Sequence, residues 1–319
     1  MKKQFIPLTI MLVIAMCIIS EYTGEKEIIF PEISALAIGT WVMEKPAWDN
    51  NDLFFWISPT IAALTGLIIT RFFPYVPLLM IMGAFVLVVI QLKIMGSEVT
   101  PSLSAAILPI LTHTQSWYYP LSVCVLTGII VCGKKLIDNS YKEKGTSNEF
   151  LKNIKEREKV NFTQEELINW IKLLISIILV SGFALYFHWN YIIAPPLIVT
   201  FVELAKPNGK LHFKTALVFI SLVLAAFLGV LWLYIVYYLL HLSVWISAGL
   251  CMVCIFFVFY FLRFTLPPAA AIALLPIILS PKDLCMYPWQ VLIGSFIFLL
   301  INLSWVKKLP VSKFLFPVL

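Results

Sequence analysis

Long apolar runs alternate with short polar connections along almost the whole chain. Eight runs approach the length of about 20 apolar residues that a helical span needs, and they cover residues 5–20, 53–69, 75–92, 117–131, 167–187, 213–237, 242–262 and 289–305. Inside lipid only helices and closed barrels satisfy every backbone group. The pattern therefore predicts an all-α polytopic membrane protein. The first run also resembles a signal peptide, but the repeat described below requires it as a helix, so we expect an uncleaved span.

Four shorter apolar elements carry proline or glycine and lie at 28–43, 100–114, 192–204 and 265–281. A helix that ends within the bilayer leaves backbone groups without partners unless protein or water supplies them. These elements either cross in full or re-enter from one side. Pro46 and Pro281 near their ends favour broken or re-entrant helices.

The two halves of the chain match in order. Pro101 and Pro109 have the same separation as Pro268 and Pro276. Further matches join 107–111 with 274–278, Tyr119-Pro120 with Tyr287-Pro288, Lys45-Pro46 with Lys206-Pro207, and the small residues of 58–66 with those of 221–229. We expect two tandem repeats, 1–138 and 167–319, each with four full spans and two short elements. Residues 139–166 form a polar linker with a short surface helix.

Composition and charge support this architecture. The chain is 61% hydrophobic and 13% charged, whereas soluble domains carry about 25% charged residues. Basic residues gather in the N-terminus, the linker and the C-terminus, which predicts that all three face the cytoplasm of a plasma-membrane protein. An even number of crossings per half follows, so the repeats are parallel. Topology, not nucleic-acid binding, then explains the net charge of +6.

The proline-rich element of the second half resembles the HPP family of integral membrane proteins. That family is named for a His-Pro-Pro tripeptide before a small-residue, Leu-Leu-Pro segment, and residues 266–276 read LPPAAAIALLP. A second family signature is similar to LAKP at 204–207. Leu266 replaces the family histidine, and Thr100 precedes the matching proline of the first half. Similar family members include nitrite transporters, so the resemblance implies a small-solute transporter.

Basic residues at one junction are candidates for anion binding. Lys206, Asn208 and Lys214 flank the step from a short element to a long span, and Lys45 corresponds to Lys206 in the first half. If the short helices end inside the protein, these side chains face an anionic solute, aided by helix N-termini. The alternative is that the lysines snorkel to the membrane surface.

Carboxylates in the short elements form a second group of candidates. Glu203 and Glu32 are proton or cation candidates, because a carboxylate within a membrane is costly. Glu32 also suits a structural role in the first turn of a helix. The remaining candidates line the proline-rich elements as small, polar or helix-starting residues: Thr100, Ser104, Pro267 and Pro268. Their alternative role is close helix packing.

Catalytic and metal-binding patterns are missing from the sequence. Cys251 and Cys254 have the spacing of a metal pair but no His or Asp nearby, and there is no phosphate-binding loop. We expect no enzyme activity, cofactor or metal site. The expected function is a transporter or channel for a small solute, with a nitrite-like anion favoured and a path between the repeats. The alternative is a membrane subunit or intramembrane enzyme. The expected partners are the solute and the lipid bilayer. The sequence leaves open whether the protein forms a homo-oligomer.

Overall fold

The computed structural model contains helices and no strands among the residues that it describes, which exclude 49–50, 74–75, 143–163, 207–213 and 307–319. Eight helices in this part of the chain are long and apolar enough to cross a membrane. They are α1 (Ile6–Thr23), α3 (Asp52–Phe72), α4 (Pro77–Met95), α6 (Tyr118–Lys142), α7 (Gln164–Tyr186), α9 (Thr215–Leu233, extended by the π-helical turn Tyr234–Leu239), α10 (Val244–Phe261) and α13 (Tyr287–Ile301). The eight predicted spans are confirmed, with shifted ends.

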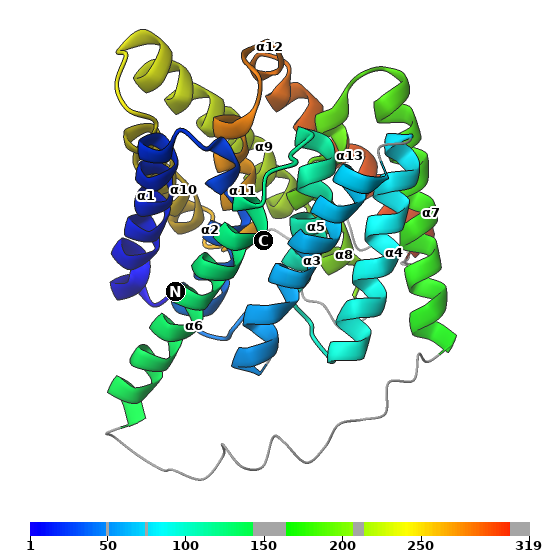
Figure 1. Cartoon of the computed structure of the whole chain (residues 1–319), viewed down its shortest axis with the longest axis horizontal. Helices are drawn as coiled ribbons and strands as arrows, with labels where there is room; N and C mark the ends of the chain where they lie inside the picture. Colours follow the sequence, from blue (N-terminus) through cyan, green and yellow to red (C-terminus); the bar gives the residue numbers. More distant parts are fainter. Residues whose placement is uncertain (49–50, 74–75, 143–163, 207–213, 307–319) are drawn as a thin grey trace, which may run out of the picture.

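Local chemistry sets several helix ends. Pro77 starts α4, where its missing N–H suits a first turn. Gly96 ends the same helix with a left-handed φ of 58°, a conformation that glycine adopts without strain. Gly24 ends α1 in the same way, with φ of 74°. These ends leave short connections that turn the chain back into the bundle (Figure 1).

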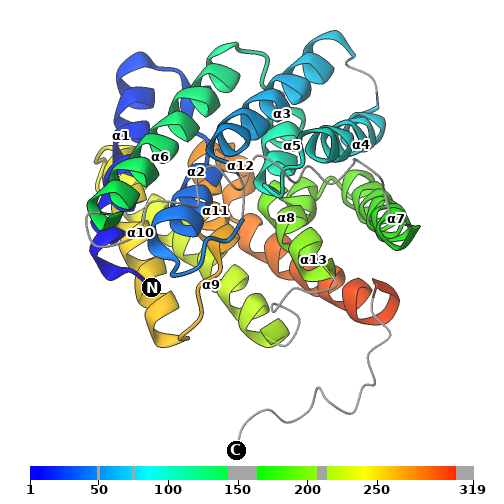
Figure 2. The same ribbon diagram turned by 90° about the horizontal axis from the view of Figure 1, so that it is seen from below.

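Four short helices form the centre of the bundle. They are α2 (Glu32–Ala37, continued by the π-helical turn Ile38–Val42), α5 (Pro101–Thr112), α8 (Pro195–Ala205) and α11 (Pro267–Leu274, continued by the 3-10 turn Leu275–Ile278). α2 packs against α5 and α11, and α8 packs against the same two helices. Figure 2 shows the short helices surrounded by the long ones. Every residue of α2 and α11 is buried, and so is every residue of α8 except Glu203.

The first short element crosses the bundle. The backbone N–H of Lys2 donates to the carbonyl of Val42 over 2.6 Å, so the chain returns to the level at which α1 begins. The Met1 ammonium lies 2.7 Å from Glu44 Oε1, and this hydrogen bond lowers the pKa of the Glu44 carboxyl. We call this side of the molecule the N-terminal end.

The second short element crosses as well. Thr100, directly before α5, contacts Trp48 at the N-terminal end. At the opposite end, the guanidinium of Arg71 lies 5.5 Å from the ring centre of Trp117, which follows α5. The chain between Thr100 and Trp117 therefore passes from one end to the other. The short elements of the first half are therefore broken helices that cross, because the extended residues beside each short helix complete the crossing.

Equivalent contacts recur in the two halves. Tyr119 Oη donates to the carbonyl of Ala105 over 2.7 Å, and Tyr287 Oη donates to the carbonyl of Ile272 over 2.7 Å. Ala105 and Ile272 are equivalent positions when the paired prolines are aligned. Both halves also start at the N-terminal end, since Glu166 near the start of α7 pairs with Lys93 of α4. These observations support a parallel duplication. The surface helix expected in the linker lies outside the described residues.

Two seams between long helices join the halves at the periphery. α1 of the first half packs along α10 of the second half, and α4 packs along α7. The two pairs lie on opposite sides of the bundle (Figure 1). The interface between the halves therefore runs from one seam, through the four short helices, to the other seam.

Candidate functional site

Three hydrogen-bond donors converge on one oxygen of Glu203. Lys206 Nζ lies 2.9 Å from Glu203 Oε1, and Trp48 Nε1 lies 3.1 Å from the same oxygen. Thr100 Oγ1 donates to it as well, and accepts from Trp48 Nε1 over 3.0 Å. We call these four residues the Glu203 cluster.

The Glu203 cluster bridges the two halves at the N-terminal end. Trp48 lies in the connection between α2 and α3, and Thr100 lies directly before α5. Glu203 lies near the end of α8, and Lys206 follows that helix. Thr100 makes no capping bond to its own helix, so its hydroxyl can serve Glu203 instead. The side chains of Glu203 and Lys206 are 15% and 35% exposed, which places the cluster at the boundary between core and solvent.

A second carboxylate lies inside the core. Glu32, at the first position of α2, is 1% exposed and accepts a hydrogen bond from Ser104 Oγ. Its other oxygen, Oε2, is buried without a hydrogen-bond partner, and so is the hydroxyl of Ser102. A buried polar atom with no partner is costly, so these atoms call for an explanation other than stability.

Helix α5 links the two carboxylates. Thr100 and Ser104 are four residues apart and lie on one face of the helix, about 6 Å apart along its axis. Each hydroxyl contacts one carboxylate, Thr100 contacting Glu203 and Ser104 contacting Glu32. The arrangement is a short row of polar groups that leads from the N-terminal end into the buried core.

The other predicted residues do not join this row through any contact found. Lys45 is exposed, and Lys214 is exposed with its Nζ 5.4 Å from the ring centre of Phe264. Pro267 and Pro268 are buried at the start of α11, which packs on α2 and α8. Asn208 lies outside the described residues.

Sequence reasoning missed Trp48. It lies in a polar connection, where a tryptophan looks like an interfacial residue, yet it is 5% exposed. One feature of the sequence could have indicated its role. A buried indole N–H needs a hydrogen-bond acceptor, and the carboxylates of the short elements are candidate acceptors. Its partner Glu203 is 155 positions away, so the pairing depends on the fold.

The Glu203 cluster has the donor set of a small oxyanion site. An ammonium, an indole N–H and a hydroxyl that converge on one carboxylate oxygen would hold an oxygen of an external anion in the same way. With Glu203 in place the charge of Lys206 is matched, so an anion binds there only in exchange for the carboxylate. Within the described residues no group of His, Cys, Asp and Glu side chains could hold a metal ion.

Comparisons with known proteins give a match to one protein family. No curated protein and no solved structure matches the chain. The family described as HPP, transmembrane region, matches residues 159–311, just under half of the chain and nearly all of its second repeat. The match includes α8, the Glu203–Lys206 pair and α11 with its Leu-Pro-Pro start. This match confirms the resemblance of the second half to the HPP family of membrane proteins.

Proposed function

We propose that this protein transports a small solute across the membrane, with a small monovalent anion such as nitrite as the substrate class. The HPP family is a membrane family associated with transport rather than catalysis. The path runs between the two repeats, along the polar face of α5. The observation that carries the proposal is the convergence of three donors on Glu203 Oε1.

In this proposal Glu203 occupies the anion site in the state described above. An arriving anion exchanges with the carboxylate and takes its place on Lys206, Thr100 and Trp48. Protonation of Glu203 favours the exchange, because it removes the negative charge that holds Lys206. Since Trp48 and Thr100 belong to the first repeat and Glu203 to the second, the exchange also breaks the direct hydrogen bonds between the repeats. Binding is thereby coupled to the movement that opens the path.

Glu32 is the second functional group along the proposed path. Its unpartnered Oε2 and the unpartnered Ser102 hydroxyl supply a buried acceptor and a buried donor. A carboxylate kept in an apolar core at this cost marks a proton or ion pathway more often than a structural contact. In this proposal Glu32 takes the proton that accompanies the anion along the path.

The proposed orientation places the N-terminal end in the cytoplasm of a cell with this protein in its plasma membrane. Basic residues at that end include Lys2, Lys3, Lys45, Lys93, Lys134, Lys135, Lys206, Lys214 and Arg263. At the opposite end the described basic residues are Lys26, Arg71 and Lys282. Cytoplasmic ends of membrane proteins carry the excess of Lys and Arg, which supports this orientation.

The test is nitrite uptake into proteoliposomes that contain the purified protein. Lys206→Ala removes a charge-assisted hydrogen bond, which contributes about 1.5–3 kcal/mol, so we expect the initial uptake rate at low nitrite to fall at least about tenfold. Glu203→Gln keeps the shape but removes the competing charge, so we expect a lower KM for nitrite. Lys282→Ala, an exposed lysine at the opposite end, is the matched control and should transport like the wild type.

Two outcomes separate the function from the site. If wild-type liposomes take up neither nitrite nor other small anions or neutral solutes faster than empty liposomes, the transport function is refuted. If uptake is present and Lys206→Ala transports as fast as Lys282→Ala, the function stands and the Glu203 cluster is not its binding site.

A further inference from the structure

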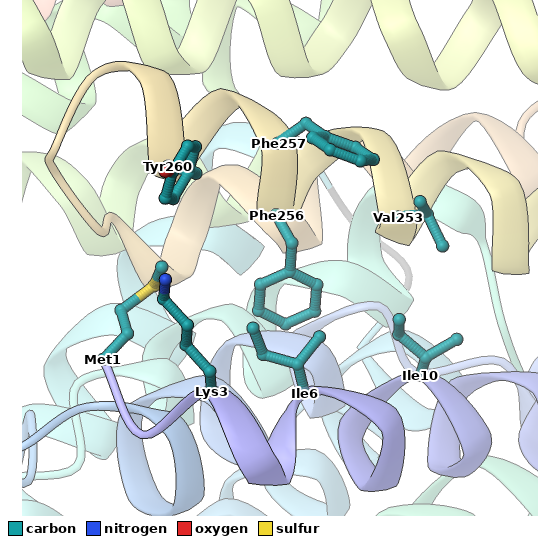
Figure 3. Close-up of a pocket in the computed structure, with 8 residues that line it drawn as sticks. All are labelled: Met1, Lys3, Ile6, Ile10, Val253, Phe256, Phe257 and Tyr260. Atoms are coloured by element: carbon teal, nitrogen blue, oxygen red, sulfur yellow. The ribbon is translucent and has the colours of Figure 1, made fainter.

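An apolar groove runs between α1 and α10, on the outer side of one seam between the halves. It has a volume of about 340 Å³ and is lined by Met1, Lys3, Ile6, Ile10, Val253, Phe256, Phe257 and Tyr260. Figure 3 shows Ile6 and Phe256 pointing toward one another, with Lys3 beside Tyr260 where the groove ends. The groove is separate from the Glu203 cluster and shares no residue with it.

The helices beside the groove present apolar side chains outward. Met11 on α1 and Phe257 and Phe261 on α10 are exposed. In a bundle of membrane-spanning helices such side chains face the acyl chains of the bilayer, because no water is present at that depth. The groove therefore opens toward lipid and suits an occupant that is already there.

The groove has one charged end. Lys3 is exposed, and its Nζ lies 4.9 Å from the ring centre of Tyr260. No carboxylate lies within ion-pair distance of Lys3 in the described part of the chain. Arg263, three residues after Tyr260, is also exposed and adds positive charge at the same level. The apolar part, from Lys3 to Ile10, extends about 10 Å along α1.

We infer that this groove binds an anionic phospholipid. The acyl chain lies between α1 and α10, and the headgroup phosphate pairs with the Lys3 ammonium beside the ring of Tyr260. Charge selects the lipid: a net negative headgroup is attracted to a basic membrane-surface site by about 1 kcal/mol per Lys or Arg near it, whereas a zwitterionic headgroup gains far less. The inference is independent of which solute the protein transports.

A bound lipid would stabilise the association of the two halves. α1 and α10 belong to different halves, and they approach closely where Ile14 packs over Gly249. An acyl chain in the groove adds contacts to both helices on the lipid side of this seam. The lipid therefore binds the assembled halves and not the separated helices, so it raises the thermal stability of the protein by mass action.

The experiment compares lipid binding by the full-length protein purified in a mild detergent. Phosphatidylglycerol, phosphatidylcholine with the same chains, and inorganic phosphate are added separately. Bound lipid is counted by native mass spectrometry, and Tm is followed by tryptophan fluorescence. For the wild type we expect phosphatidylglycerol to bind at least about fivefold more tightly than phosphatidylcholine, which corresponds to about one charge contact, and to raise Tm by several degrees. Inorganic phosphate should leave Tm unchanged.

Two pairs of variants locate the site. Lys3→Ala should abolish the preference for phosphatidylglycerol, whereas Lys135→Ala, which removes an exposed lysine from α6 at the same end, should keep it. Val253→Trp fills the groove and should reduce binding of both lipids there, whereas Val86→Trp on α4 should not. Val253 and Val86 are each 38% exposed, so the two changes are matched in environment.

The inference is overturned if the wild type binds both lipids equally. It is also overturned if Lys3→Ala keeps the preference for phosphatidylglycerol and Val253→Trp binds both lipids as well as the wild type does. An increase in Tm with inorganic phosphate as large as that with phosphatidylglycerol would also overturn it, because the bound molecule would then be a free anion. Should Lys3→Ala fail to fold, Val253→Trp against Val86→Trp decides the question alone.

Discussion

Replacement of Gly66 by alanine should destabilise the fold, and replacement of Gly229 should do so equally. A Cβ at Gly66 would lie 2.2 Å from the backbone oxygen of Ala106, and a Cβ at Gly229 would lie 2.2 Å from the backbone oxygen of Ala273. In each half a long helix therefore touches the backbone of a short helix through a glycine. The two pairs are equivalent positions of the repeat.

The magnitude follows from the contact distance. A carbon atom and a carbonyl oxygen approach to about 3.3 Å, so the helices must separate by about 1 Å to admit the methyl group. The atom in the way belongs to a buried backbone, which cannot rotate aside as a flexible side chain could. Overpacking of this kind costs about 1–3 kcal/mol. The better helix propensity of alanine offsets at most about 1 kcal/mol, so we expect a net loss of about 1–2 kcal/mol.

The assay is thermal unfolding in detergent, followed by tryptophan fluorescence. Gly83→Ala on α4 and Gly182→Ala on α7 are the controls, because an added Cβ at either position meets no atom within 4 Å. These controls should unfold at or slightly above the wild-type temperature, whereas Gly66→Ala and Gly229→Ala should unfold several degrees below it. Unfolding of all four variants at one temperature would refute the packing argument. A loss at only one of the two sites would refute the equivalence of the halves.

Two further predictions concern the repeat and the orientation. Tyr119→Phe and Tyr287→Phe each remove a buried hydrogen bond to a short helix. Each should lower the free energy of unfolding by about 1 kcal/mol, measured by the same thermal assay. A difference of several degrees between the Tm values of the two variants would contradict the repeat. On intact cells a membrane-impermeant maleimide should label the exposed Cys285 at the opposite end, and not the buried Cys17. Labelling of Cys285 only after the cells are opened would reverse the proposed orientation.

The fold was largely predictable because apolar length and proline position are local properties. All eight spans and all four short elements appear near their expected places. Whether the short elements cross or re-enter was not predictable. That question depends on the bond from Lys2 to Val42 and on the contact of Arg71 with Trp117, which join residues far apart in sequence.

The site was predictable in its residue types but not in its pairing. Lys206 and Glu203 were named as an anion-binding cation and a proton or cation site, and the fold pairs them with each other. Because Lys206 is already paired with Glu203, an external anion would have to displace the carboxylate and could not simply bind to a free ammonium. Lys45, the sequence counterpart of Lys206, is exposed, and position 42 of the first half holds a valine where the second half has Glu203.

Packing contacts recur in the two halves, but the polar groups around the carboxylates do not. When the prolines are aligned, Thr100 and Ser104 of α5 correspond to Pro267 and Ala271 of α11. The two hydroxyls that contact Glu203 and Glu32 therefore both lie on the first copy. In the proposed transporter, a symmetric scaffold would let the two halves move against one another between equivalent states, and a single polar face would give one path for the solute. The buried Leu266, in place of the family histidine, keeps the second copy apolar at the corresponding helix start.

Substitution of Glu32 tests whether its carboxylate has a structural or a functional role. If it serves as a first-turn acid of α2, Glu32→Met should lower stability by about 0.3–1 kcal/mol. If it is retained for transport, an apolar residue of similar volume should fit the core as well or better, since a buried carboxylate with one unpartnered oxygen is costly. We expect Glu32→Met to unfold at or above the wild-type temperature and to lose nitrite uptake. Ser104→Ala alone should lower Tm, because it removes the donor to Glu32, and should have little effect in the Glu32→Met background. Uptake that persists in Glu32→Met would remove Glu32 from the path, whatever its stability.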